Sequence, residues 1–464
     1  MEQHPSKRKG DIMDFNLWNL LTDTALLGAL MLVGQLLRAK VKIFQKLLMP
    51  ASLIGGFIGL ALGPSGLNIL PFSTQLGSYS SVLIAVIFAC TPIGDKSITK
   101  EDMKGVGGFF YQNTGIAVLQ YALGMLLALG LLNKIWPNLH DGFGLALATG
   151  FYGGHGTAAA VGDAFKNYGY PEFLDLGNVS ATVGLVGGIV FGMILINWGT
   201  RKGYTNYVES PEELPNEIRT GLIPKEKQKS GSKITISNMS LDPLVFHLAI
   251  VLIAAYLGRW SSQLIESWVD WLSIPVFVLA LVFGYIVQFV LTKSGAIEYV
   301  DRHTIQRISG SSTDFLTISA IAALRLDVVA ANFGPLLITF VLGLILNIAW
   351  LLWVSKYASS RDWFERGIMN YGRANGVIAT GVLLNRVVDP DQKSRGLEDT
   401  GITDLLNRPI LIALQVLPPL LISFGRKWAW NMTLMMWAVF IILTVVALSR
   451  KWWTPGKMQV EEKI

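Results

Sequence analysis

Long apolar runs alternate with short polar connections along the whole chain. Most of them approach the roughly 20 residues that a helix needs to cross a bilayer. We therefore expect a bundle of membrane helices, with apolar runs at 16–37, 47–62, 79–95, 106–133, 142–163, 176–198, 243–258, 273–292, 310–325, 333–355, 367–388, 405–424 and 429–448. Glycine and polar residues interrupt the runs 142–163 and 367–388, so we expect re-entrant or broken segments there instead of crossings.

The first interruption reads Gly-Phe-Tyr-Gly-Gly-His-Gly-Thr-Ala-Ala-Ala over residues 150–160. Backbone at membrane depth leaves its helix only where protein or a water-filled cavity satisfies the freed groups. The helix that resumes after such a break directs N–H groups and a positive dipole end toward an anion. We expect a solute to bind at Gly154, His155, Gly156 and Thr157. The alternative for His155 is a packing histidine at a helix kink.

The second interruption, over 371–381, is a partly degenerate copy of the first. It offers Arg373, Asn375, Gly376 and Thr380 as substrate-binding residues, and Asn375 aligns with His155. Arginine can bind a carboxylate through two parallel hydrogen bonds. The alternative for Arg373 is that it extends to the cytoplasmic interface or pairs with a structural carboxylate.

The distribution of charge tests this reading of the runs. If the N-terminus lies outside and each broken segment returns to the side it entered, most of the 38 Lys and Arg residues lie on the inside. This bias agrees with the positive-inside rule. It places the central loop and the C-terminus in the cytoplasm, and only the cluster Lys7-Arg8-Lys9 fits poorly.

Five crossings before the central loop give the second half an orientation opposite to the first. Residues 77–83 resemble 310–316, and Asp175-Leu-Gly-Asn178 resembles Asp404-Leu-Leu-Asn407. The sequence thus predicts an all-α polytopic membrane protein with two inverted five-helix repeats, each with a glycine-rich broken segment, plus one extra C-terminal helix. We expect a tail (1–15), a first repeat (16–198), a cytoplasmic linker (199–241), a second repeat (242–425), and the extra helix and tail (426–464).

Sodium in such proteins is held by oxygen atoms of broken helices and polar side chains. Serine, threonine and aspartate gather near two helix starts, and these are our candidate sodium ligands: Ser80, Ser81, Ser311, Ser312, Thr313 and Asp314. The alternative for each is ordinary helix capping, which favours the same residue types.

Composition excludes several other classes of protein. Only 15% of the residues are charged, well below the roughly 25% of soluble domains, so the net charge of +6 reports topology and not nucleic-acid binding. The five histidines are scattered and Cys90 is the single cysteine, so we expect no cofactor and no transition-metal site. The nucleotide-binding, serine-hydrolase and zinc-protease motifs are missing from the sequence, which argues against an ATP-driven pump and an enzyme.

Gly-Gly-His-Gly-Thr in a long apolar half, a polar central connection and a second half of the same plan resemble the bacterial sodium/glutamate symporter family. The resemblance implies two five-helix domains of opposite orientation, re-entrant loops, a homodimer in the inner membrane, and uptake of glutamate with sodium. It further implies that Gly153–Thr157 form the first loop and that Gly372, Asn375 and Gly376 stand in the second. The chain resembles a divergent member, because its second loop is poorer in glycine and carries Arg373, and because it has an extra C-terminal span.

These observations predict a secondary active transporter that couples sodium entry to uptake of glutamate or a similar anionic amino acid. The partners we expect are therefore this substrate, sodium, the lipid bilayer and a second copy of the chain. The alternative is a channel or a sodium-independent transporter or exporter of another small organic anion. A third class, an intramembrane enzyme with His155 as base, would need a partner carboxylate or serine close by.

Overall fold

The computed structural model describes residues 15–47, 49–94, 106–208, 216–228, 230–268, 274–359, 362–389 and 393–456. Nearly all of the predicted tail 1–15 lies outside these ranges, as do the last residues of the chain. The protein is 77% helical, and the described residues form no strand. The expectation of an all-helical protein is therefore confirmed.

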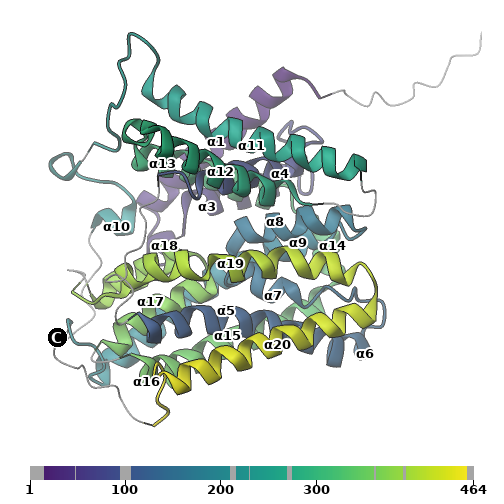
Figure 1. The fold of residues 1–464 in the computed structure, drawn as a ribbon, viewed down its shortest axis with the longest axis vertical. Helices are drawn as coiled ribbons and strands as arrows, with labels where there is room; N and C mark the ends of the chain where they lie inside the picture. The colour runs from purple at the N-terminus through teal and green to yellow at the C-terminus, as the bar shows by residue number, and fades with distance from the viewer. Residues whose placement is uncertain are drawn as a thin grey trace, which may run out of the picture.

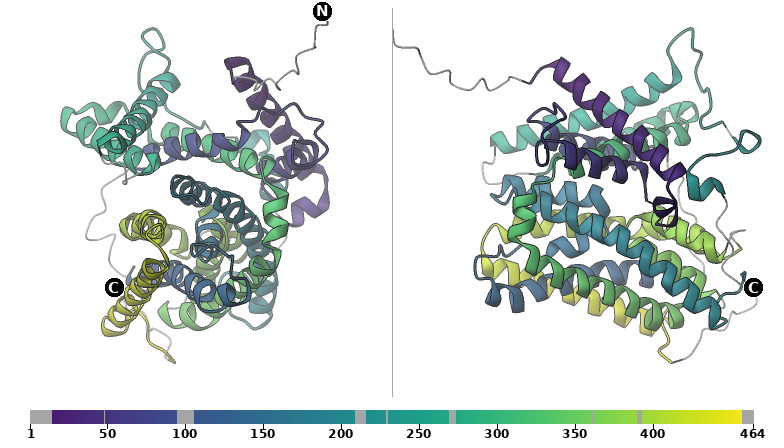
Figure 2. Two further views of the ribbon diagram at one scale, coloured as in Figure 1. Left: turned by 90° about the vertical axis from the view of Figure 1, so that its right-hand side faces the viewer. Right: turned by 180° about the vertical axis from the view of Figure 1, so that it is seen from behind.

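The helices pack in two layers, which lie one above the other in Figure 1. The upper layer contains helices from both halves of the chain: α1 (Leu17–Lys40), α3 (Ala51–Leu62), α4 (Tyr79–Cys90), α11 (Pro243–Trp268), α12 (Val276–Ser294) and α13 (Arg302–Ala322). Within it, α13 packs against both α3 and α4, and α12 packs against α4 and α11. The two halves are therefore intertwined and do not stand side by side (Figure 2).

The lower layer also draws on both halves. Its long helices are α5 (Gly107–Leu127), α9 (Phe173–Arg201), α15 (Phe333–Trp350), α19 (Gly396–Ile422) and α20 (Arg426–Ser449). Between them lie the shorter helices α7 (Leu145–Gly150), α8 (Gly154–Asn167), α17 (Trp363–Asn375) and α18 (Ile378–Val388). The last helix, α20, covers α5 and α19 from the outer side of this layer (Figure 1).

Among the described residues, eight helical spans are long and apolar enough to cross a membrane. They comprise α1, α9, α11, α12, α19 and α20, together with α5 continued to Ile135 and α15 continued to Ala358. Three predicted crossings do not qualify. Helices α3 and α4 have 12 residues each, about 18 Å of helix, which is shorter than a bilayer core of about 30 Å. Helix α13 has the length, but polar side chains follow one another along it.

Both predicted interruptions break the helix and turn the chain back on itself. In the first, α7 ends at Gly150 and α8 begins at Gly154, and the ring of His140 before α7 stacks on Tyr170 after α8, with centroids 3.8 Å apart. In the second, α17 ends at Asn375 and α18 begins at Ile378. These segments are helical hairpins, here called the first and the second hairpin.

A contact between two glycines holds the second hairpin together. A Cβ on Gly372 of α17 would lie 2.7 Å from the Cα of Gly381 in α18, so the two backbones touch. The amide of Asn385 in α18 also donates to the carbonyl of Glu365 at the start of α17, at 3.0 Å. The second hairpin therefore leaves on the side where it entered.

Candidate functional site

The tips of the two hairpins meet in the middle of the protein. Gly154 has a φ of +65°, a conformation that L side chains rarely adopt. A Cβ at this position would lie 2.7 Å from Cγ1 of Val377 and 3.6 Å from the carbonyl oxygen of Gly376. Segments more than two hundred residues apart in sequence are thus in contact at the first residue of α8 and at the chain entering α18.

Two buried amides bind the carbonyl groups that the second break frees. Gln120 of α5 and Asn347 of α15 both donate to the carbonyl oxygen of Ala374, at 2.8 Å and 3.2 Å. Asn347 also donates to Oδ1 of Asn375 at 2.8 Å, and Asn375 in turn donates to the carbonyl of Tyr371. A helix break at membrane depth requires such partners for its freed backbone groups, and Gln120 and Asn347 provide them. The Asn375 side chain therefore holds the hairpin in place through both of its polar ends.

His155 lies in the first turn of α8 and contacts α9. Its Nε2 lies 3.1 Å from Oγ1 of Thr182, and both side chains are buried. The Thr182 hydroxyl donates a hydrogen bond to the carbonyl of Asn178 at 3.0 Å, so its oxygen accepts a hydrogen bond from Nε2 of His155. This arrangement fixes the ring and the tautomer that carries the proton on Nε2.

The two hairpin tips are partly accessible. Val377 and Ile378 are 37% and 42% exposed, and Gly156 and Thr157 are partly exposed. A Cβ on Gly156 would lie 3.6 Å from Cδ1 of Ile84 in α4, so this side of the first tip faces the upper layer. Thr380, by contrast, is buried inside the second hairpin, next to Gly376.

Arg373 lies near the end of α17 and contacts α5, α19 and Tyr152, which stands in the break of the first hairpin. Its Nη1 forms an ion pair with Asp404 at 2.6 Å, and its Nε donates to Oδ1 of Asn113 at 2.8 Å and to the Tyr152 hydroxyl at 3.1 Å. Its Cζ lies 4.9 Å from the centroid of the Tyr152 ring. The structural carboxylate that the sequence offered as an alternative partner for this arginine is thus Asp404.

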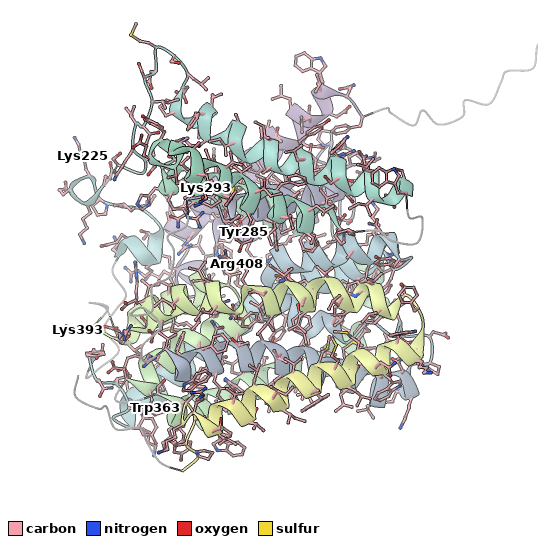
Figure 3. The ribbon with its side chains drawn as sticks, viewed as in Figure 1. Lys225, Tyr285, Lys293, Trp363, Lys393 and Arg408 are labelled. Atoms are coloured by element: carbon pink, nitrogen blue, oxygen red, sulfur yellow. The ribbon has the colours of Figure 1, made fainter. Side chains whose placement is uncertain are left out.

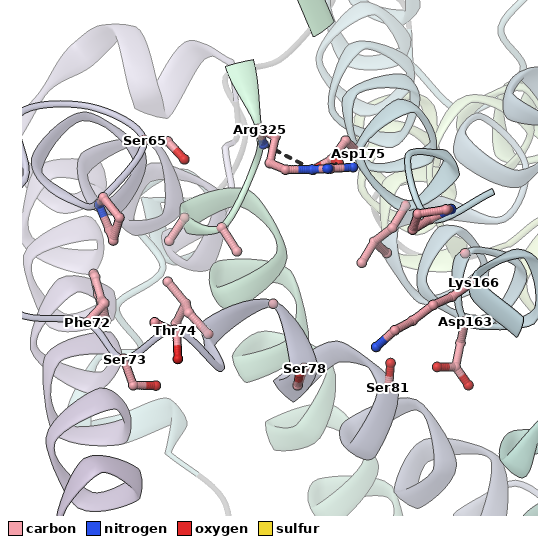
Figure 4. A pocket seen from close by; sticks show the side chains of 18 of the residues that line it. Ser65, Phe72, Ser73, Thr74, Ser78, Ser81, Asp163, Lys166, Asp175 and Arg325 are labelled. Carbon is pink, nitrogen blue, oxygen red and sulfur yellow. Dashed lines mark hydrogen bonds and ion pairs between the residues drawn. The ribbon is translucent and has the colours of Figure 1, made fainter. Parts of the chain in front are cut away.

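Two cavities lie between the layers. The larger, of about 590 Å³, is lined by residues of α8 and α9 on one side and by α4 and the loop before it on the other, including Ser78, Ser81, Asp163, Lys166 and Asp175 (Figure 4). The ion pair of Asp175 with Arg325, at 2.8 Å, lies at its rim. We call this space the Asp163 cavity.

The smaller cavity, of about 180 Å³, lies on the other side of the hairpin tips. It is lined by Phe88 and Thr91 of α4, Leu281 of α12, Arg373, and a row of α19 residues: Asp404, Arg408, Leu411, Ile412 and Gln415. Figure 3 shows Arg408 at the boundary between the two layers. We call this space the Arg373 cavity.

An apolar cluster separates the cavities. From the residue before α4 to the residue after it, Ser78 and Ser81 of the Asp163 cavity come first, and the buried Ile84 follows. Phe88 and Thr91 of the Arg373 cavity come last. Ile84 packs with buried side chains from both layers: Ala159, Ala160, Phe277 and Leu316. Along α4, the cluster therefore lies between the two cavities.

The structure does not gather the candidate sodium ligands into one site. Ser81 bonds to Asp163 at the Asp163 cavity, and Ser80 is buried beside it in α4. Ser311 and Ser312 line a different cavity, near the linker residues 232–244. Thr313 donates to the carbonyl of Ser309, and Asp314 accepts from Ser52 of α3 at 3.1 Å. Four candidates thus lie in the middle of α13, away from the hairpin tips.

A buried acid anchors the beginning of the central linker to the second hairpin. The backbone and side-chain amides of Asn206 donate to the carboxylate of Glu365, at 2.5 Å and 3.2 Å. Glu365 is fully buried at the start of α17, and burial raises its pKa to about 7. Tyr207 adds a hydrogen bond to Asp362 at 2.8 Å. The linker is therefore tied to the lower layer from its first residues.

Sequence reasoning missed the polar residues that surround Arg373. Asn113 and Thr403 lie in or beside apolar runs and have no motif of their own. Two signals were present: Tyr152 belongs to the first glycine-rich interruption, and the repeated Asp-Leu-x-Asn marks Asp404 and Asn407 in the N-terminal half of the helix that follows the second hairpin.

Comparison with known families agrees with this architecture. The model of the sodium/glutamate symporter family matches residues 17–364, which include the whole first hairpin and stop at the beginning of the second. A search of the curated proteins finds no match. Because the family match covers well over half of the chain, and its helices are long and apolar enough for several membrane crossings, the chain belongs to the sodium/glutamate symporter family of multi-pass membrane transporters.

Proposed function

We propose that the protein is a secondary active transporter that couples sodium entry to the uptake of glutamate or a similar anionic amino acid. Membership of the sodium/glutamate symporter family supports this substrate and this coupling ion. One sodium ion moving down about 100 mV provides roughly 2.3 kcal/mol before any concentration gradient is counted. Uptake of an anionic amino acid against its gradient therefore calls for more than one sodium per cycle.

The observation that carries the proposal is the contact between the hairpin tips at Gly154 and Val377. Helices α8 and α18 both begin there, so two positive helix ends and their unpaired N–H groups converge on one point. Such a point favours the carboxylates of the substrate. Gly154, His155, Gly156 and Thr157 form its first side, and Gly376 with the start of α18 forms its second.

Alternating access follows from the two cavities and the cluster between them. The substrate enters one cavity, binds at the tips, and leaves through the other when the apolar contacts around Ile84 are exchanged. A channel would need an open path past these side chains. The buried cluster therefore favours a transporter over the channel or passive exporter that the sequence left open.

We further propose that the protein consists of two inverted repeats, 16–198 and 242–425, joined by the cytoplasmic linker. Both halves run through the same order: an upper-layer group, a long helix, a hairpin, and a helix that carries Asp-Leu-x-Asn in its N-terminal half. A bacterial inner-membrane location, a cytoplasmic C-terminus and a homodimer complete the proposal. Accessibility tags in the linker and at the C-terminus should both report the cytoplasm; a tag on the opposite side would refute the predicted topology.

Binding measurements on the purified protein in nanodiscs test the substrate. We expect radiolabelled glutamate to bind in the presence of sodium, and unlabelled glutamine to compete at least tenfold less well, because it lacks the side-chain carboxylate that the converging helix ends favour. Equal competition by glutamine would contradict an anion site at the tips. Binding of a different small organic anion in place of glutamate would favour the alternative transporter class.

A further inference from the structure

The repeated Asp-Leu-x-Asn carries the same pair of features in both halves. Asp175 and Asp404 each form an ion pair with an arginine, at 2.8 Å and 2.6 Å. Three residues later, Asn178 and Asn407 each have a buried Oδ1 without a hydrogen-bond partner among the described residues. A buried oxygen left without a partner is costly, so its recurrence at one motif calls for a ligand.

The two copies differ in their surroundings. Arg325, the partner of Asp175, has a side chain that is 45% exposed and lies at the rim of the Asp163 cavity, where water reaches it. Arg373, the partner of Asp404, has a side chain that is only 8% exposed, and it belongs to the second hairpin. A change in the partner of Asp404 therefore affects Arg373, which belongs to the hairpin that forms the proposed substrate site.

Polar side chains surround Asp404 on several sides. Asn407 is fully buried, and its Nδ2 lies 3.5 Å from the Tyr152 hydroxyl, which places the unpartnered Oδ1 in the same cluster. Nδ2 of Asn113 donates to Oγ1 of Thr403 at 2.9 Å and to Oδ1 of Asp404 at 3.4 Å. Carboxylate, amide and hydroxyl oxygens are the donors that a hard cation prefers. The Arg373 cavity gives this cluster access to the space between the layers.

We propose that Asp404 and Asn407 form a binding site for the coupling cation, and that the cation takes the place of Arg373 on Asp404. Arg373 is then free to bind a substrate carboxylate with its planar guanidinium. This inference rests on the proposed function, because it assumes an anionic substrate and a cation that enters with it.

Charge balance explains why the two ligands bind together. A cation at Asp404 without substrate leaves the buried charge of Arg373 without a counter-charge. Substrate on Arg373 without the cation leaves the charge of Asp404 without one. Both unpaired forms are disfavoured at buried sites, so each ligand binds alone with lower affinity and needs a higher concentration. When both ligands are bound, each charge has a partner again. Each ligand therefore raises the affinity for the other by the same factor.

Sodium binding without substrate tests the cation site on its own. We would measure binding of ²²Na⁺ to the purified protein in nanodiscs, comparing wild type with Asp404→Asn. Asp399→Asn is a matched control, because Asp399 also pairs with an arginine of α17, Arg366, from its position on α19. We expect Asp404→Asn to lose one bound sodium and Asp399→Asn to lose none. Unchanged sodium binding in Asp404→Asn would overturn the proposal.

Glutamate binding tests the link to Arg373. In the wild type, we expect saturating sodium to lower the Kd for glutamate at least tenfold. In Asp404→Asn, Arg373 is free without any cation, so the Kd should be the same with and without sodium. A sodium effect of wild-type size in this variant would overturn the proposal. A wild type that binds sodium at Asp404 but binds no glutamate would refute the proposed substrate and leave the cation site standing.

A third variant covers the case in which Asp404→Asn does not fold. Asn407→Leu removes the oxygen that has no partner and leaves the ion pair of Arg373 and Asp404 intact. We expect it to raise the sodium Kd at least tenfold. A sodium Kd equal to that of the wild type would exclude Asn407 from the site and refute the proposal.

Discussion

Gly154 lies directly against Val377, so the first residue of α8 touches the residue that precedes α18. Two features make glycine necessary at this position: the φ of +65° and a Cβ position only 2.7 Å from Cγ1 of Val377. The contact joins the two hairpins at the point where two helix N-termini converge. The proposed substrate site depends on it more than on any other contact.

Gly154→Ala should therefore abolish or strongly reduce transport. The positive φ costs a residue with a Cβ about 1–2 kcal/mol, and the overlap with Val377 pushes the tips apart. Gly295→Ala is the matched control, because Gly295 has a φ of +78° but no described heavy atom within 4 Å of its Cβ position. Uptake in proteoliposomes should fall at least tenfold for the first variant and stay near wild type for the second. Similar uptake by both variants would show that transport does not depend on the contact between Gly154 and Val377.

His155→Ala should lower uptake at least tenfold with little loss of folded protein. The substitution removes the hydrogen bond to Thr182 and a polar group in the first turn of α8, but few contacts that hold the layers together. His303→Ala, at an exposed position of α13, serves as the control. Size-exclusion profiles and transport rates check both variants. Normal transport by His155→Ala would remove this residue from the site.

Arg373→Lys should weaken glutamate binding about tenfold. Lysine keeps the charge for Asp404 but lacks the planar fork that contacts Asp404, Asn113 and Tyr152 at the same time and that would bind a carboxylate through two hydrogen bonds. A Kd measurement at saturating sodium gives the result. An unchanged Kd would assign Arg373 a purely structural role.

Glu365 gives the stability of the protein a pH dependence with a defined sign. Its pKa rises from 4.5 in the unfolded chain to about 7 in the folded protein because the carboxyl is buried. Between these values the folded state binds more protons than the unfolded state, so the free energy of unfolding falls as the pH rises. Glu365→Gln removes this titration and retains an acceptor for the Asn206 amide.

The Tm of Glu365→Gln relative to wild type should therefore increase from pH 5 to pH 8. Differential scanning fluorimetry in detergent checks this difference at each pH. A Tm difference that stays constant over this range would show that Glu365 does not titrate there.

Patterns local in the sequence predicted much of the fold. The apolar runs identified the long helices, and the glycines around Gly154 and Gly376 marked both breaks within a few residues. These signals are strong because a helix break in a membrane needs small residues and polar partners close by. The lengths of α3 and α4 were less predictable, because apolar residues continue beyond the ends of these helices.

The candidate site was harder to predict than the breaks. The sequence predicted a glycine-rich break in each half, but nothing in it shows that Asn375 is held by Asn347 or that Arg373 pairs with Asp404. These contacts join helices hundreds of residues apart and depend on how the layers pack. The sodium candidates illustrate the same limit: a serine-rich helix start has the same composition whether it caps, packs or binds an ion.

Uptake of radiolabelled glutamate into proteoliposomes is the decisive test of sodium-coupled transport by this protein. The protein is reconstituted with the membrane potential clamped, and uptake is followed with an inward sodium gradient, with equal sodium on both sides, and with potassium in place of sodium. We expect glutamate to accumulate inside the proteoliposomes above its external concentration only when the sodium gradient points inward. Correctly inserted protein that equilibrates glutamate without accumulation, or transports it equally well in potassium, would contradict sodium-coupled uptake.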